Sequence, residues 1–159
     1  KTLHEAAMNK ALALSVCLCM AGCTTVQIPN YIEGDHAYTH KMYGQYDRIV
    51  IAVKRVLARN RWKIQGQTRP DVYERTQGDG QNADKSVLLF TDVKQHSMVL
   101  YSSYTHLNVY VYAIAEGAQV QIRYGKVTPL LVKQMRSTRA DKLAQRLLEE
   151  IEQDLVENK

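Results

Sequence analysis

The amino-acid sequence predicts an α+β fold: an antiparallel β-sheet of about four to six strands with two helices packed on one of its faces. Three observations indicate this two-layer sandwich. Two segments repeat apolar residues at helical spacing, the segments between them alternate apolar and polar residues, and polar turns separate the alternating stretches. Two amphipathic helices and a one-sided sheet all need an apolar partner surface, and packing them together supplies it.

Length and composition fit one such domain with short appendages. The chain has 159 residues, of which 45% are hydrophobic and 23% charged, with a formal net charge of +5. These values exclude a wholly disordered chain, and the length excludes a large multidomain enzyme. The mild positive charge favours an anionic partner or surface without identifying one.

The first helix is expected over residues 45–59. Its apolar residues recur at helical spacing, and basic side chains lie largely on the opposite side. Asp47 falls in the first turn, where a carboxylate stabilises the positive end of the helix dipole, and Asn60 is a candidate C-cap. These signals agree on one amphipathic helix. Its apolar positions are Tyr46, Ile49, Val50, Val53 and Leu57.

The second helix is expected to begin near Leu130, or at Ser137 as its N-cap, and to end at about Glu157. Pro129 closes the preceding strand region, and acidic side chains fill the outer side of the helix. Because the apolar stripe is continuous, this side of the helix is expected to lie on the sheet. The stripe consists of Ala140, Leu143, Ala144, Leu147, Leu148, Ile151 and Leu155.

One strand is expected before the first helix, and the others are expected between the two helices. The last one places Val120 and Ile122 on one face and glutamine and arginine on the other. One dry and one wet face indicate an antiparallel sheet that is covered on one side. The polar region 68–85 is expected to be mostly loop. The expected strands are 35–42, 62–66, a short one at 72–76, 86–94, 97–104, 107–115 and 118–124.

The N-terminus has the organisation of a secretory signal. Lys10 supplies a short positive region, residues 11–19 are apolar, and small residues precede Cys23. The apolar stretch is too short for a membrane-spanning helix, which needs about 20 residues. Translation is expected to start at Met8, which places residues 1–7 before the true start; the alternative is a longer positive region.

Residues 20–23 read Met-Ala-Gly-Cys and resemble the lipobox of bacterial lipoproteins, with methionine where leucine is more usual. The resemblance implies that Cys23 becomes the lipidated first residue of the mature chain. Cleavage there leaves 137 of the 159 residues and removes Cys17 and Cys19. The mature chain then has no free thiol, and therefore no disulfide, thiolate nucleophile or cysteine metal site.

The same resemblance predicts where the protein resides. Thr24, rather than aspartate, follows the lipidated cysteine, which by analogy with lipoprotein sorting in Gram-negative bacteria favours the outer membrane, with the domain facing the periplasm. The expected division of the chain is a signal peptide over 1–22, a lipidated cysteine and tether over 23–34, and a single α+β domain over 35–159. Pro29, Asn30 and Gly34 support the tether.

The domain itself resembles a group of small, uncharacterised bacterial lipoproteins. The resemblance lies in Tyr31–Gly34 before a first strand, Tyr46–Val53 opening a helix, and Leu57 followed by Trp62–Ile64 opening a strand. It covers about residues 20–155 in the order of the elements, and it concerns architecture rather than chemistry. Similar small α+β lipoproteins are accessories of outer-membrane assembly machines, so the resemblance implies an envelope protein as partner, although fold alone does not determine function.

Metal binding is not expected. Glu33, Asp35, His36 and His40 fall within eight residues, a cluster that would hold a metal ion if it were helical. The segment reads as a strand, in which four residues span about 13 Å, too far for both histidines to reach one ion. The sequence therefore indicates no metal site and no other cofactor.

Catalytic patterns are also weak. Serines and a threonine lie near His96 and His106, but none stands in a Gly-x-Ser-x-Gly elbow. The loop Gly78–Gly80 lacks the Gly-Lys-Ser/Thr ending of a phosphate-binding loop. We therefore expect a protein that is not an enzyme.

Tyrosines are the most distinctive feature outside the N-terminus: the chain has 10 Tyr but 1 Phe and 1 Trp. Val109 and Val111 alternate with two of these tyrosines, so helices on the valine face leave the tyrosine face for solvent or for a ligand. The alternative is that these rings cover a core or a sheet edge. The candidate binding face consists of Tyr101, Tyr104, Tyr110 and Tyr112.

A group of basic residues offers a second kind of surface. A secreted lipoprotein rarely meets nucleic acid, so anionic lipid or lipopolysaccharide fits better, and an ordinary solvated helix side is the alternative. The sequence thus favours a non-catalytic interaction or envelope-assembly module, with a binding module for a small ligand or glycan as the alternative. The basic residues are Lys54, Arg55, Arg59, Arg61, Lys63 and Arg69.

Overall fold

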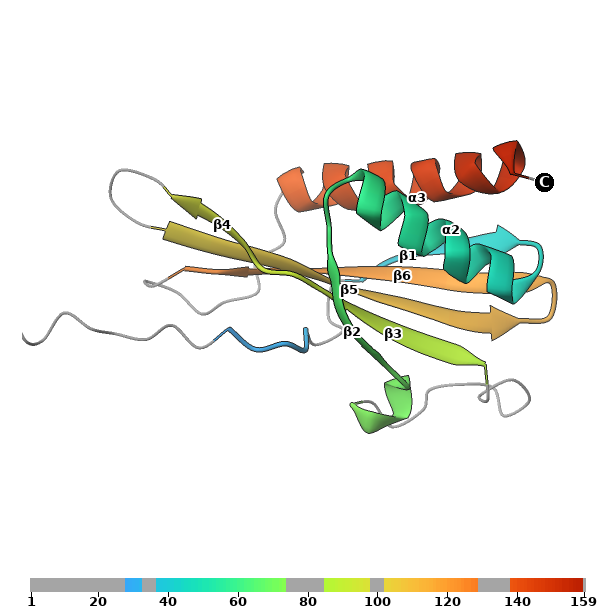
Figure 1. Ribbon diagram of the computed structural model, residues 1–159, viewed down its shortest axis with the longest axis horizontal. Helices are drawn as coiled ribbons and strands as arrows, with labels where there is room; N and C mark the ends of the chain where they lie inside the picture. Colours follow the sequence, from blue (N-terminus) through green and yellow to red (C-terminus); the bar gives the residue numbers. More distant parts are fainter. Residues whose placement is uncertain (1–27, 33–36, 74–84, 98–101, 129–137, 159) are drawn as a thin grey trace, which may run out of the picture.

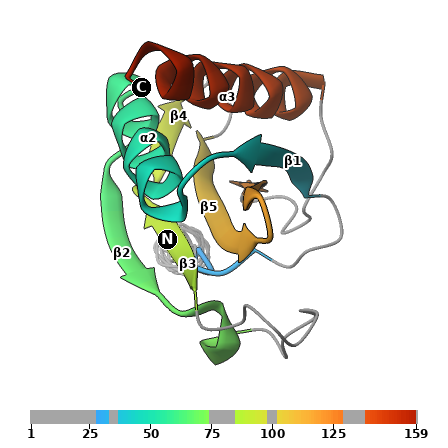
Figure 2. The same cartoon turned by 90° about the vertical axis from the view of Figure 1, so that its right-hand side faces the viewer.

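A computed structural model describes residues 28–32, 37–73, 85–97, 102–128 and 138–158. Two helices, α2 (Tyr46–Arg59) and α3 (Thr138–Glu157), lie side by side on one face of a six-stranded antiparallel sheet (Figures 1 and 2). The predicted α+β architecture, with sheet and helices packed together, is therefore confirmed. None of the described helices is long and apolar enough to cross a membrane.

The sheet has the strand order β1-β6-β5-β3-β2, and β4 pairs with β5 on the same edge as β3, along the part of β5 that β3 does not reach. The central strand β5 is long because β3 pairs with its second half and β4 with its first half. Every strand pair in the sheet is antiparallel. A short turn suffices to join β5 to β6, as antiparallel pairing allows. The strands are β1 (Tyr38–Tyr43), β2 (Ile64–Thr68), β3 (Ser86–Thr91), β4 (Lys94–Ser97), β5 (Ser102–Ile114) and β6 (Gly117–Val127).

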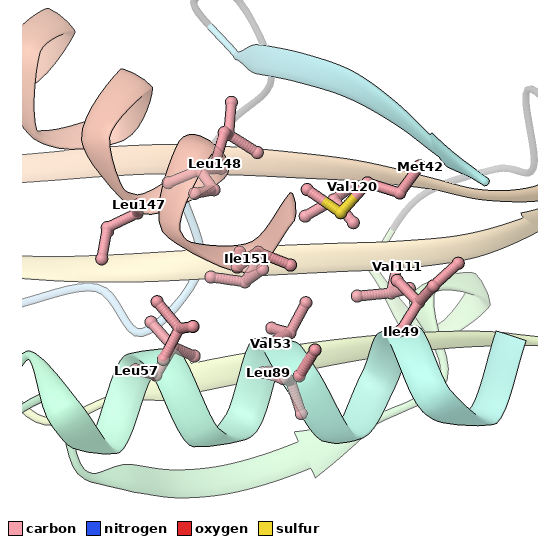
Figure 3. Close-up of a cluster of buried hydrophobic side chains, with 14 of the residues drawn as sticks. Met42, Ile49, Val53, Leu57, Leu89, Val111, Val120, Leu147, Leu148 and Ile151 are labelled. Atoms are coloured by element: carbon pink, nitrogen blue, oxygen red, sulfur yellow. The ribbon is translucent and has the colours of Figure 1, made fainter. Parts of the chain in front are cut away.

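The main hydrophobic core lies between the helices and the sheet. Figure 3 shows α2 and α3 directing aliphatic side chains toward those of four strands. The apolar spacing predicted for both helices is the spacing that faces this core, since all the labelled helical residues are buried. The labelled residues are Met42, Ile49, Val53, Leu57, Leu89, Val111, Val120, Leu147, Leu148 and Ile151.

The end of α2 is a Schellman motif. The Trp62 N–H bonds the Leu57 carbonyl at 2.8 Å, and the Arg61 N–H bonds the Ala58 carbonyl at 2.9 Å, which satisfies two carbonyls of the last turn. Asn60 is the C-cap, as predicted, and Arg61 occupies the left-handed position at φ 60°. Glycine is the residue that adopts this conformation without strain.

A polar seam joins α2 to α3. The carboxylate of Asp154 on α3 is 1% exposed and lies 2.7 Å from a guanidinium nitrogen of both Arg55 and Arg59 on α2. Asn60 extends the seam, since its amide donates to the Glu150 carboxylate. Charge-assisted bonds to a buried carboxylate fix how the two helices lie against each other. Two of the predicted basic residues thus bind an acidic partner within the domain.

Three strand predictions are wrong in part. The stretch 86–94 is broken because Asp92 leaves the ladder: its carboxylate accepts from the Lys63 N–H at 2.9 Å, and its own N–H donates to the Lys63 carbonyl at 2.7 Å. Residues 97–104 are not one strand, since β4 ends at Ser97 and pairs there with Ser102 of β5. Val72 belongs to a 3-10 turn, Pro70–Val72, because proline favours the first position of a helical turn.

Candidate binding face on the outer side of the sheet

The two faces of the sheet differ as the alternation predicts. Val109 and Val111 of β5 point into the core beneath the helices, while Tyr110 and its even-numbered neighbours point to the opposite side, here called the outer face. The register places Asn108 beside Arg123 of β6. The outer face therefore carries polar and aromatic side chains in its centre, where a solvated sheet face would expose them.

This face is covered in part by the segment Ile28–Ile32, here called the strap. It lies on the side of the sheet away from α2 and α3 (Figures 1 and 2). Ile32 is 3% exposed, and its N–H donates to the Asn108 side-chain carbonyl at 2.6 Å. The Asn108 amide donates in turn to the Asn30 carbonyl at 3.0 Å. One side-chain amide thus binds the strap backbone as both donor and acceptor, which fixes its position along β5.

Because the strap packs on the sheet, residues 28–32 differ from the expected tether. The turn-forming residues of that segment gave a correct indication of an irregular chain but not of its contacts.

Arg123 joins the strap to the sheet. Its guanidinium donates to the Ile32 carbonyl at 3.1 Å and to the Tyr31 hydroxyl at 3.2 Å, and it lies 4.2 Å from the centre of the Tyr110 ring. Arg123 is 4% exposed, so these contacts are made largely out of water. A buried guanidinium requires such hydrogen bonds and ring contacts to offset its lost hydration. The strap carbonyl is one of the groups that meet this requirement.

His106 lies beneath the strap and is 3% exposed. A Cβ atom built on Gly125 would lie 2.6 Å from His106 Cε1 and 3.0 Å from Ile32 Cδ1, so glycine is needed for the imidazole and Ile32 to pack there. Burial lowers the pKa of His106 below 6.5, and the nearby Pro29 backbone opposes part of this shift. Neither ring nitrogen makes a hydrogen bond of normal geometry within the described residues.

An aromatic row extends the site toward β3. The Tyr31 ring stacks on Tyr73 with 5.0 Å between centroids, and Tyr73 meets Phe90 edge-on at 5.5 Å. Tyr73 is 46% exposed, so the row is accessible from solvent at this point. Stacked rings of this kind add about 0.5–1.5 kcal/mol beyond their buried area.

The structure separates the residues of the predicted tyrosine face. Tyr110 is 3% exposed beneath Arg123, so the expectation of an open tyrosine face does not hold at this position. Tyr104 and Tyr112 are half-buried. Tyr101 and Cys23 lie outside the described residues. Tyr110 therefore contributes to a covered site, together with residues that the sequence pattern does not single out.

Those missed residues are Asn108, Arg123 and the strap. At outward positions of alternating strands, an asparagine and an arginine read as ordinary solvent-facing residues. The one local signal is Gly125, which directly follows the predicted strand 118–124 and lies inside β6, because a glycine within a strand marks the close approach of another group. Here that group is the imidazole of His106 with Ile32 above it.

The remaining candidates do not converge on a site. His40 is exposed and lies 3.5 Å from Glu152, whereas His36 is outside the described residues. Across the described ranges, no three histidine, cysteine or carboxylate side chains are grouped to hold a metal ion. Lys54 bonds Gln67 at 2.9 Å.

Comparison with family models and with curated proteins found no match to this chain.

Proposed function

We propose that this protein is an outer-membrane lipoprotein anchored through Cys23, whose periplasmic α+β domain is a non-catalytic interaction module for envelope proteins. The observation that carries the anchor is the sequence Met-Ala-Gly-Cys at 20–23 after a short apolar stretch. The lipid on Cys23 would hold the domain at the outer membrane. The interaction role is supported by the outer face, where Asn108 and Arg123 bind the backbone of the strap.

The chemistry of the outer face favours binding over catalysis. Side-chain amide and guanidinium groups recognise carbonyl and N–H groups well, and both groups lie within a ladder that holds them rigidly. Recognition of backbone atoms by fixed polar groups is a common way for a protein to hold a polypeptide segment.

The anchor and the outer face would lie close together. Five residue steps separate Cys23 from Ile28, and an extended chain covers at most about 18 Å over that length. A lipid on Cys23 would therefore keep the strap end of the domain near the membrane surface. The domain would meet its partners at that surface, where integral envelope proteins are found.

The lipid anchor is tested with Cys23→Ala. The wild-type chain should fractionate with membranes and have a mass increased by acyl chains. The variant should lose both properties. Membrane fractionation and mass that are the same for both chains would overturn the anchor.

The interaction role is tested by co-purification. The tagged chain is isolated from detergent-solubilised envelopes, and its partners are identified by mass spectrometry. A matched preparation carries Asn108→Ala, and an exposed substitution, Ile51→Ala on α2, is the control. A partner retained by wild type and by the control but reduced in the Asn108 variant supports the proposal. Recovery of the wild-type chain alone contradicts it.

A further inference from the structure

The strap shows what the outer face recognises. Three of its bonds go to backbone atoms: Asn108 bonds the Ile32 N–H and the Asn30 carbonyl, and Arg123 bonds the Ile32 carbonyl. Backbone atoms are common to all residues, so these bonds do not depend on the side chains of the segment that they hold. The register of the segment is set by the sheet, because Asn108 and Arg123 are neighbours on β5 and β6.

Two strap side chains add selectivity. Ile32 is 3% exposed and packs against the ring of His106 over Gly125, so an aliphatic side chain is favoured at this position. Tyr31 stacks on Tyr73 and accepts a hydrogen bond from Arg123, so an aromatic side chain is favoured just before it. The site therefore fits an aromatic residue followed by an aliphatic one.

The strap does not satisfy every group beneath it. His106 is 3% exposed, and neither ring nitrogen makes a hydrogen bond of normal geometry within the described residues. The Pro29 backbone next to the ring can accept through its carbonyl but has no N–H, so it offers no donor to the acceptor nitrogen of the neutral imidazole. A buried polar group without a partner loses its hydration on folding and gains no hydrogen bond in exchange. A segment with an N–H at the position of Pro29 would supply the donor that the strap lacks there.

We propose that the outer face is a peptide-exchange site, at which a segment of a partner protein, with an aromatic residue followed by an aliphatic one, replaces the strap on Asn108 and Arg123. This inference rests on the proposed role as an interaction module and names the kind of partner surface. The strap then acts as an internal competitor. Its covalent attachment gives it a millimolar effective concentration, so exchange requires a partner that binds more tightly or that is held close at the membrane.

The test uses purified full chain and a fluorescent peptide with the sequence of residues 27–33. Tyr31→Ala combined with Ile32→Ala weakens the strap without altering the sheet. Fluorescence anisotropy should give at least tenfold tighter peptide binding to this double variant than to wild type. Adding Asn108→Ala should weaken binding about tenfold, whereas Gln119→Ala, farther along the same face of β6, should change it less than twofold. A peptide carrying both alanines should not bind.

Three outcomes would overturn the proposal. A folded double variant that does not bind the peptide rejects exchange. If that variant does not fold, hydrogen exchange of wild type decides: an Ile32 amide that exchanges as slowly as the slowest amides of β5 means that the strap opens only on global unfolding. A concentration-dependent dimer of wild type in light scattering, lost with Asn108→Ala, means exchange between two copies instead of binding of a partner.

Failure here is separable from failure of the proposed function. Peptide binding is measured without lipid or envelope, and co-purification is measured without the peptide. A co-purified partner combined with absent peptide binding rejects the exchange site alone.

Discussion

Gly125→Ala tests the packing beneath the strap most sharply. The added methyl group would meet His106 Cε1 at 2.6 Å and Ile32 Cδ1 at 3.0 Å, and the imidazole cannot move freely because it is 3% exposed. Overpacking of this kind costs about 1–3 kcal/mol. Alanine in a strand is otherwise about 0.5–1 kcal/mol more favourable than glycine. The net expectation is a loss of about 1–2 kcal/mol in the free energy of unfolding.

The matched background is His106→Ala, which removes the nearest atoms. In that background Gly125→Ala should be neutral or stabilise by up to about 1 kcal/mol, so the two substitutions should couple by at least about 1 kcal/mol. Urea unfolding is followed by fluorescence of the single tryptophan, Trp62, which is 5% exposed. The same cost for Gly125→Ala in both backgrounds would refute the placement of His106 over Gly125.

Three further predictions concern the helices and the buried histidine. Arg61→Gly should stabilise the domain by about 1 kcal/mol because glycine adopts the left-handed conformation of this position without strain, whereas Arg61→Ala should not stabilise it. Equal effects of the two variants in urea unfolding would mean that the loss of the positive charge, and not the backbone conformation, is the cause. Asp154→Ala should lower the free energy of unfolding by about 2–3 kcal/mol, a value already reduced because the two arginines that pair with Asp154 are half-exposed. The exposed control, Glu152→Ala, should lower it by less than about 0.5 kcal/mol. Comparable losses for the two variants would argue against the seam. The pKa of His106 is lowered in the fold, so the unfolded chain takes up its proton first, and stability is full above pH 6.5 and falls as the pH drops through that value. His106→Leu should therefore make the free energy of unfolding differ less between pH 7.5 and pH 5 than it does in wild type. The same pH difference in both chains would reject the contribution of His106.

Regular alternation and helical spacing were sufficient to predict the architecture. Val109 and Val111 face the core and Tyr110 faces away, as the period of two requires, because side chains alternate across a strand whatever its neighbours are. The spacing of 45–59 likewise matched a helix from Tyr46 to Arg59. These features depend on residues close in sequence, where periodicity is informative.

The strap and the strand break depend on distant residues instead. Asn108 lies 76 positions from Ile32, and Arg123 lies 91 positions from it, so nothing near residues 28–32 indicates where that segment packs. The break after β3 requires Lys63, which is 29 positions from Asp92. In both cases a polar side chain satisfies the backbone of a remote segment. A single sequence contains the two partners but not their pairing.

The central claim, that the outer face receives a segment of an envelope protein, is tested most directly by photo-crosslinking in cells. A photoreactive aromatic residue replaces Tyr73, which is 46% exposed and stacks on the strap, or Tyr43, which is 70% exposed on β1, as control. We predict an adduct at position 73 whose crosslinked peptide carries an aromatic residue followed by an aliphatic one, and no such adduct at position 43. No adduct at position 73, or the same adducts at both positions, would contradict the account.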